Sequence, residues 1–367
     1  MIPPHKHIYS VSYCPISSEE TSVECSYVII MIDKLFGSNS KSFQTKTFLF
    51  YGIKGQERWA KLRQYGYPWH LETWGTTTPR SRLVKKVLVL LSYVNVHPYA
   101  ICRDINVYQN SIYYKISLRF HNLGIFLGSP GPNRKIVVFG MRENQGYFIK
   151  VPISQKSSEL LKNEVFALNF LSKNRSTENL IPKFEFYEGL LVTRDVRSSR
   201  STKLIASKDV YEVYNKLYSA SSHTIALSHL LSKNFSKEFL IKLKNNEVSN
   251  PIICNLAHKI IEFCDNTLDL EATVNVYKAH GDLTAWNMFI DNSGQPKIID
   301  LEMFGEQPEF FDLIHYFCSY EILVKKSPKD QIFDNLKLSL NDYIPKTQFK
   351  FNFLLYILRQ SIIYCEI

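Results

Sequence analysis

Two neighbouring stretches carry the strongest signal in this chain of 367 residues: His280-Gly-Asp-Leu-Thr-Ala-Trp-Asn287 and Pro296-Lys-Ile-Ile-Asp300-Leu-Glu302. The first stretch follows an expected strand and enters another. A turn of sequence Asp-Asn-Ser-Gly-Gln then leads into a third short strand. Because two strands joined by such a turn bring the residues at their free ends together, we expect Asp282, Asn287 and Asp300 to lie at the same end of a hairpin.

These three side chains suit phosphoryl transfer. Mg²⁺ prefers hard oxygen ligands and keeps waters and substrate phosphates in its shell, so one carboxylate and one amide oxygen from the protein suffice. Asn287 and Asp300 are therefore predicted to bind Mg²⁺. Asp282 would orient an attacking hydroxyl and accept its proton, as the catalytic-loop aspartate does in protein kinases. His280 is expected to pack and hydrogen-bond within the loop rather than to carry a proton.

A second pair of residues supports this interpretation. Lys150 lies in an expected strand that follows a glycine-containing turn, and Glu164 lies on the next expected helix. A kinase needs a lysine on the ATP phosphates and an acid on the following helix that holds it. The alternative, a surface lysine and an unrelated helix acid, stays open at this point.

The HGDxxxxN and IIDxE segments resemble those of the aminoglycoside phosphotransferase and choline kinase group, relatives of protein kinases. The resemblance covers about residues 111–367 and is specific in these catalytic segments. It implies that Asp282 is the catalytic base, that Asn287 and Asp300 bind magnesium, that Lys150 contacts the ATP phosphates and that Glu164 fixes Lys150.

The resemblance extends to three weaker features. Asp312 matches the acid of that group at the start of the following helix, which implies a structural role in holding the catalytic loop. Gly128 and Gly131 occupy the position of the phosphate-cradling loop, although their spacing is not GxGxxG. Thr193 falls at the hinge position, where backbone groups would meet the adenine of ATP.

The implied fold class is α+β: a bilobal protein-kinase-like fold with a small β-rich N-lobe over 111–195 and a mainly helical C-lobe over 196–367. Residues 1–110 have no counterpart in the minimal fold and are expected to form an extra α+β module, basic and rich in aromatic residues. Hydrophobic periodicity predicts strands over 27–33, 47–53, 112–118, 124–127, 135–139, 147–152, 190–193, 275–278, 288–290 and 297–299, and helices over 82–94, from Ser158 to Leu171, and over 210–217, 226–231, 251–265, 310–324 and 351–364.

Composition narrows the class of protein. Apolar residues make up 45% and charged residues 21%, which is typical of a globular chain. The seven cysteines are scattered and form no CxxC pair, so neither a disulfide framework nor a zinc site is expected. The N-terminus has no pattern of a secretory signal, and the aliphatic run over 87–94 is too short to span a bilayer. We therefore expect a cytoplasmic protein.

The acceptor is inferred from charge. Between Glu321 and Lys350 lysines outnumber acidic residues, which disfavours a polycationic aminoglycoside. By analogy we favour a hydroxyl of a sugar or glycan-lipid of bacterial cell-surface polysaccharide metabolism as acceptor, with an aminoglycoside or choline-type amino-alcohol kinase as the alternative. Only seven residues separate Asp300 from Pro308, too few for a protein kinase's peptide-binding segment. A kinase-like binding scaffold without catalysis is the alternative of another class, although no expected functional residue is missing.

The N-terminal third carries most of the net charge of +10, with fifteen basic and seven acidic residues up to position 130. Residues 54–86 hold eight basic and two acidic residues together with Trp59, Trp69 and Trp74. Reversible docking on an anionic membrane surface is one hypothesis for this segment. The alternatives are tryptophans that belong to the core beside a solvated basic face and, less favoured, nucleic-acid binding.

Overall fold

The computed structural model describes residues 30–37, 42–53, 56–64, 66–73, 79–98, 100–128, 134–197, 205–234 and 271–366, together with isolated positions between 252 and 269. Among them, no helix combines the length and the apolar character needed to cross a membrane. The chain divides into two compact units: Met1–Leu161 with Lys183–Asp195, and Lys162–Pro182 with Val196–Ile367.

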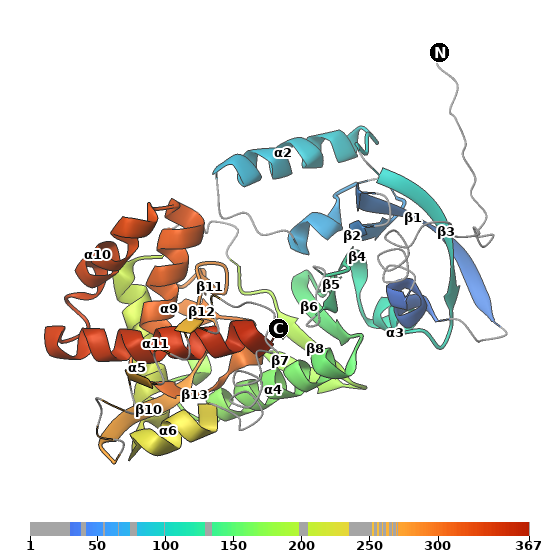
Figure 1. Ribbon diagram of the computed structural model, residues 1–367. Helices are drawn as coiled ribbons and strands as arrows, with labels where there is room; N and C mark the ends of the chain where they lie inside the picture. The colour runs from blue at the N-terminus through green and yellow to red at the C-terminus, as the bar shows by residue number, and fades with distance from the viewer. Residues whose placement is uncertain are drawn as a thin grey trace. The chain divides into compact units, whose positions relative to one another are not determined.

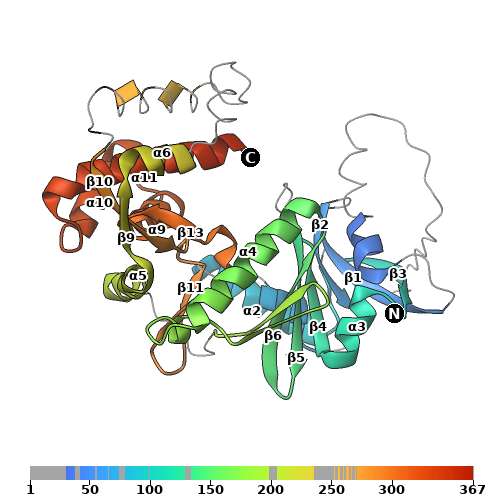
Figure 2. The ribbon, with the colours of Figure 1, turned by 90° about the horizontal axis from the view of Figure 1, so that it is seen from below.

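The first unit is built on an eight-stranded antiparallel sheet of order β3-β1-β2-β4-β5-β6-β8-β7 (Figures 1 and 2). Its strands are β1 (Phe43–Ile53), β2 (Gln56–Leu62), β3 (Ala100–Tyr108), β4 (His121–Phe126), β5 (Lys135–Arg142), β6 (Gln145–Pro152), β7 (Phe184–Tyr187) and β8 (Leu190–Arg194). Every expected strand from 124 to 193 is thus present. The structure does not divide at residue 110, because β2 pairs with β4 and joins the strands of the expected module to those of the expected N-lobe.

The helices of this unit are the 3₁₀ helix η1 (Trp69–Thr73), α2 (Pro79–Tyr93), α3 (Ile112–Arg119) and the start of α4 (Gln155–Ser172), which from Lys162 on belongs to the second unit. The core of the unit joins the strands to α3 and to a helical turn over 30–36, through fully buried side chains such as Phe36, Phe48 and Ile116.

Two expected strands are helical instead. Residues 30–36 form a helix, so the strand expected over 27–33 is wrong for its described part; Met31 and Leu35, four residues apart, are both buried on one face. The strand expected over 112–118 is α3. Ser111 caps this helix, because its hydroxyl oxygen accepts the Tyr114 amide hydrogen bond at 3.1 Å. The alternation of aliphatic residues in this segment is typical of a strand, but the N-cap at Ser111 favours a helix.

The N-terminus of α4 also differs from the expectation. The hydroxyl of Ser154 accepts the amide hydrogen bond of Ser157 at 3.1 Å, so Ser154 caps the helix, which begins at Gln155 and not at the expected Ser158. The apolar residues Leu161, Leu168 and Leu171, whose spacing predicts this helix, are buried. Glu164 therefore lies on this helix, as the sequence predicts.

Two of the three clustered tryptophans pack within the first unit. Trp59 lies 5.6 Å from Phe126 between ring centroids, and Trp69 stacks on Phe139 at 5.9 Å. Both rings are half-buried, and Trp74 lies outside the described residues. These packed rings match the core alternative for the segment better than an exposed aromatic belt.

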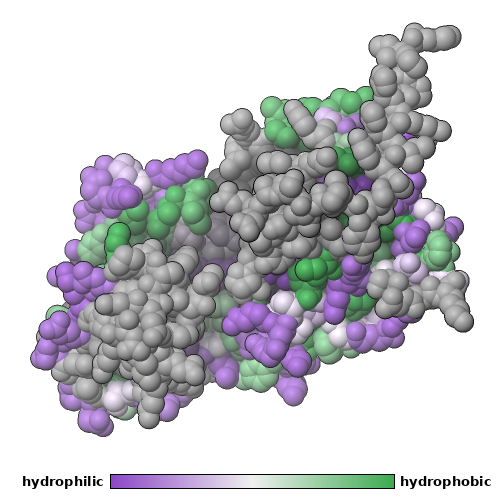
Figure 3. Space-filling model, turned by 45° about the vertical axis from the view of Figure 1, so that its right-hand side comes forward, coloured by the Kyte–Doolittle hydropathy of each residue, from purple (hydrophilic) through white to green (hydrophobic). Residues whose placement is uncertain are grey.

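Helix α2 is present where the periodicity predicts it, but its apolar stripe faces outward. Leu83, Leu90 and Val94 are each more than 60% exposed. In Figure 3, hydrophobic residues reach the surface near the upper edge of the molecule, where Figure 1 draws α2. The rule that an apolar stripe faces the core thus fails here.

The second unit is mainly helical, as expected. It contains α5 (Ser207–Ser221), α6 (Leu227–Asn234), α9 (Phe311–Ser319), which continues as the π-helical η4 (Tyr320–Lys325), α10 (Lys329–Leu340) and α11 (Lys346–Glu366). Its strands are β9 (His223–Ala226), β10 (Thr273–Ala279), β11 (Met288–Ile290), β12 (Pro296–Ile298) and β13 (Gly305–Pro308), and its 3₁₀ helices are η2 (Glu178–Leu180) and η3 (Leu301–Met303). The helix expected over 251–265 lies largely outside the described residues. A β-rich first unit and a mainly helical second unit confirm the α+β class.

Candidate active site

The candidate catalytic loop follows β10 and is held by one buried carboxylate. The backbone amides of His280 and Gly281 donate hydrogen bonds to the two carboxylate oxygens of Asp312, at 2.8 and 3.0 Å. Asp312 is fully buried in the first turn of α9, and its own amide donates to the Tyr277 hydroxyl at 3.1 Å. Burial, and next the charge of Asp312, raise the pKa of Tyr277 well above 10, so this phenol stays neutral. Asp312 therefore fixes the entry of the loop, in agreement with the role that the resemblance implies.

His280 is a structural residue of the loop. Its side chain is buried, and its Nε2 lies 2.9 Å from the carbonyl oxygen of Ile299. Because a carbonyl oxygen only accepts hydrogen bonds, Nε2 carries the proton, and Nδ1 is left to accept the Asp282 amide at 3.3 Å. Both ring nitrogens are thus used within the loop, as the sequence led us to expect.

Gly281 allows the loop to approach the segment that follows Asp300. Its φ of +84° is a left-handed conformation that favours glycine. A Cβ at this position would lie 2.2 Å from the carbonyl oxygen of Met303, far inside van der Waals contact. The glycine of the HGD motif is therefore required by close packing against η3.

Asp282 is partly accessible to solvent. Its side chain is 42% exposed, and each of its carboxylate oxygens meets one donor. Asn287 Nδ2 lies 3.1 Å from Asp282 Oδ2, and His315 Nε2 lies 3.0 Å from Oδ1. Since a carboxylate oxygen has two lone pairs, each oxygen keeps one for a further donor such as a substrate hydroxyl.

Asn287 and Asp300 occupy neighbouring positions at the end of the predicted hairpin. Met288 of β11 pairs with Ile298 of β12, and the Ile299 amide donates to the Asn287 carbonyl at 3.0 Å. Continuing this register sets Asn287 opposite Ile299, one residue before Asp300. The turn between the strands is closed by Asp291, whose Oδ1 accepts the amides of residues 293 and 295.

The Asn287 and Asp300 side chains fit a divalent cation. Asn287 is buried, and its Nδ2 donates to both the Asp282 carbonyl oxygen at 2.9 Å and the Asp282 carboxylate. These two bonds fix the orientation of the amide, so that its oxygen is the atom left to bind a cation. Asp300 has the left-handed φ of 63°, a strained conformation that is concentrated at functional sites. Within the described residues, three or more His, Cys, Asp or Glu side chains nowhere gather as in a metal cage, and a Mg²⁺ site with one carboxylate and one amide needs no such group.

Lys150 and Glu164 lie on the elements on which they were expected. Lys150 is in β6, where it pairs with Val137 of β5 and Leu191 of β8, and it is buried. Glu164 is buried on α4. The first belongs to the first compact unit and the second to the other. Their expected ion pair remains a prediction.

The weaker nucleotide-binding expectations receive unequal support. Gly128 has a φ of +82°, and a Cβ there would lie 2.5 Å from the Lys135 carbonyl oxygen, so a glycine is needed after β4. Gly131 lies outside the described residues. Thr193 is buried within β8 and pairs with Phe148 on one side and Phe184 on the other, so its contact with adenine stays a prediction.

Sequence reasoning missed one residue that contacts Asp282 and one that is its near neighbour in the sequence. His315 contacts its carboxylate from α9, three residues after Asp312. Trp286, which precedes Asn287, is 36% exposed despite its size. The only local signal for either was its spacing from an expected site residue.

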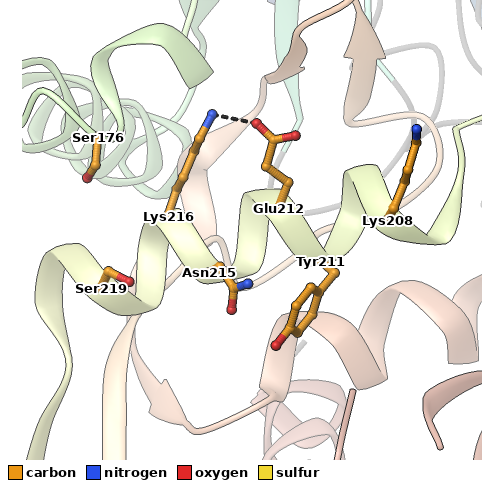
Figure 4. Close-up of a pocket in the computed structure, with 7 residues that line it drawn as sticks. All are labelled: Ser176, Lys208, Tyr211, Glu212, Asn215, Lys216 and Ser219. Carbon is orange, nitrogen blue, oxygen red and sulfur yellow. Dashed lines mark hydrogen bonds and ion pairs between the residues drawn. The ribbon is translucent and has the colours of Figure 1, made fainter. Parts of the chain in front are cut away.

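A shallow depression of about 320 Å³ lies along α5 and is distinct from these residues (Figure 4). Its lining comprises Ser176, Lys208, Tyr211, Glu212, Asn215, Lys216 and Ser219. Lys216 and Glu212 form an ion pair of 2.6 Å across successive turns of the helix. None of the expected site residues lines this depression.

No protein-family model matches the sequence, and no curated protein matches it. Among solved structures, the chain is similar to the choline kinase LicA from Streptococcus pneumoniae, at 15% identity over 70% of this chain and 88% of that one, with a TM-score of 0.47. It is also similar to an amicoumacin kinase in complex with AMP-PNP and Ca²⁺ (11% identity, 69% and 83% covered, TM-score 0.45) and to an aminoglycoside-3'-phosphotransferase of type VIII (13%, 67% and 96%, 0.42). Choline kinases and aminoglycoside phosphotransferases are also the two kinds of enzyme whose motifs this sequence resembles.

Proposed function

We propose that the chain is an ATP-dependent phosphotransferase that phosphorylates a hydroxyl group of a small molecule. The observation that carries this proposal is the grouping of Asp282, Asn287 and Asp300 at the end of the β11–β12 hairpin, with Asn287 bonded to the Asp282 carboxylate. A partly exposed carboxylate beside a buried amide and a second carboxylate is the arrangement that phosphoryl transfer to a hydroxyl requires.

Each residue has a defined task in this proposal. Asp282 accepts the proton of the attacking hydroxyl through a free lone pair of its carboxylate. Asn287 and Asp300 hold Mg²⁺. When bound, this ion supplies positive charge that offsets the negative charge of the ATP phosphates. Lys150 binds these phosphates and Glu164 orients Lys150, while Gly128 and Gly131 approach the phosphates and Thr193 the adenine.

For the acceptor we propose a sugar or glycan-lipid of bacterial cell-surface polysaccharide metabolism. Trp286 supports a ring-shaped acceptor, because an exposed indole next to Asn287 offers an apolar face with a polar edge. An aminoglycoside or choline-type amino-alcohol kinase is the second candidate. Such a substrate is cationic, whereas lysines exceed acids over 321–350. A Trp286→Ala variant should raise the KM for a sugar acceptor and leave the KM for ATP unchanged.

We further propose a cytoplasmic location with reversible docking on anionic membranes through residues 54–86. The outward-facing Leu83 and Val87 of α2 support this, since Lys86 lies between them in the sequence and is also exposed. Trp59 and Trp69 do not contribute exposed rings. Sedimentation with anionic vesicles at about 50 mM salt tests the proposal, because the Debye length there exceeds ~10 Å. Protein that stays in the supernatant would contradict it.

The phosphotransferase is tested by a screen of sugars, nucleotide sugars, lipid-linked glycans, choline and aminoglycosides that measures ADP release with Mg²⁺ and ATP. We expect release that depends on one acceptor class and is lost in Asp282→Asn. Binding of Mg²⁺–ATP without release for any acceptor would instead favour the alternative of a kinase-like scaffold.

A further inference from the structure

The carboxylate of Asp282 has a partner that the expected machinery does not include. His315 Nε2 lies 3.0 Å from Asp282 Oδ1, and the side chain of His315 is only 12% exposed. On its other side the ring faces α11, where the Tyr356 hydroxyl lies 3.2 Å and Gln360 Nε2 lies 3.4 Å from Nδ1. The imidazole therefore lies between the candidate base and the C-terminal helix.

These partners determine which nitrogen carries the proton. An amide nitrogen only donates hydrogen bonds, so Gln360 Nε2 requires Nδ1 of His315 to accept. The Tyr356 hydroxyl can also donate to Nδ1. Nε2 is then the protonated nitrogen of a neutral ring, and its hydrogen points at Asp282 Oδ1. The contact is a directed hydrogen bond in which His315 donates and Asp282 accepts.

Aromatic packing holds the imidazole ring in this orientation. The His315 ring is nearly parallel to that of Phe311, one helical turn earlier, with 4° between the planes and 6.2 Å between centroids. It lies 5.9 Å from the ring of Tyr356. A largely buried ring with fixed neighbours on two helices presents its Nε2 hydrogen at a constant position.

Helix α9 therefore controls the catalytic loop at two levels. Asp312, in its first turn, binds the loop backbone at His280 and Gly281. His315, on the next turn, binds the side chain of the residue that follows, Asp282. Since Asn287 holds the other carboxylate oxygen, the plane of the carboxylate is fixed by one donor on each oxygen.

We propose that His315 is a positioning residue: it orients the Asp282 carboxylate toward the acceptor hydroxyl and does not touch the substrate. This inference rests on the proposed function, because it assumes that Asp282 is the base. The expected consequence is kinetic. Without the Nε2 donor the carboxylate can rotate, which lowers kcat while binding of Mg²⁺–ATP is unchanged.

The test compares His315→Phe, which keeps an aromatic ring beside Phe311, with His315→Gln, whose amide can donate again. We expect His315→Phe to lower kcat by about tenfold to a hundredfold, the effect of one hydrogen bond to a charged group, with the KM for ATP and the melting temperature close to wild type. His315→Gln should recover at least part of the loss. The matched control is His223→Phe, since His223 is paired with Glu306 instead. A kcat of His315→Phe within twofold of wild type would overturn the proposal. An equal loss of kcat in His315→Phe and His315→Gln would also overturn it.

A second measurement does not depend on activity. Nitrogen-15 NMR of the histidine side chains should show His315 as the neutral Nε2–H tautomer, with resonances that shift in Asp282→Ala. An Nδ1–H tautomer, or resonances that are the same in both proteins, would refute the contact. If the wild-type protein transfers phosphate to no acceptor while these NMR results hold, the proposed function fails and the hydrogen bond does not.

Discussion

Replacement of Asp312 by alanine should destabilise the second unit and displace the catalytic loop. The carboxylate is fully buried and accepts two backbone hydrogen bonds of 2.8 and 3.0 Å, from His280 and Gly281. Alanine leaves both donors without an acceptor. A buried polar group that loses its partner costs about 1–3 kcal/mol. The two donors together predict a loss of about 2–6 kcal/mol in the free energy of unfolding.

Urea unfolding followed by tryptophan fluorescence measures this loss, and ADP release measures its effect on turnover. Asp330→Ala is the matched control, because Asp330 is an exposed acid on α10. We expect the control to change the free energy of unfolding by less than about 0.5 kcal/mol. If Asp312→Ala changes it by no more than the control and retains turnover, our reasoning on the loop is wrong.

Three further predictions concern single residues. Asp282→Ala should abolish phosphoryl transfer and leave the dissociation constant of Mg²⁺–ATP nearly intact; turnover within tenfold of wild type would show that another group is the base. Asp300→Ala should abolish Mg²⁺-dependent ATP binding in a calorimetric titration, and an unchanged dissociation constant would point to a different metal site. Burial, together with neighbouring positive charges such as that of Lys61, lowers the pKa of His70 to about 3, against about 6.5 in the unfolded chain. As the pH falls, the unfolded chain therefore takes up this proton before the folded protein does. The free energy of unfolding should fall by up to about 1.4 kcal/mol per pH unit between pH ~6 and ~4, and the stability that neutral His70 provides is complete above pH 6.5. In His70→Phe this slope of stability against pH should be smaller, and an equal slope would contradict the assignment.

The hairpin and the loop were predictable because their signals are local. The turn that begins at Asp291 closes on its own side chain, and the two strands that flank it place Asn287 and Asp300 without any long-range contact. The glycine of the HGD motif is likewise determined within the site, by its contact with Met303.

What sequence reasoning missed depends on distant partners. His315 is 33 residues from Asp282 in the sequence and 41 from Tyr356, and hydrophobic periodicity predicts no contacts between residues so far apart. The strand expected over 112–118 failed because a cap at Ser111 outweighs the alternation of aliphatic side chains. The apolar stripe of α2 was recognised, but its burial depends on what covers it, and Leu90 is 69% exposed.

The most direct test of the central claim follows the γ-phosphate of ATP itself. Wild-type protein and Asp282→Asn are incubated with Mg²⁺, ATP labelled in the γ-phosphate and a panel of sugar, amino-alcohol and aminoglycoside acceptors, and the label is then located by mass spectrometry. We predict that wild type transfers the label to a hydroxyl of one acceptor class and that Asp282→Asn does not. Label that remains on ATP or appears only as inorganic phosphate, with equal amounts in both proteins, would contradict phosphoryl transfer by this site.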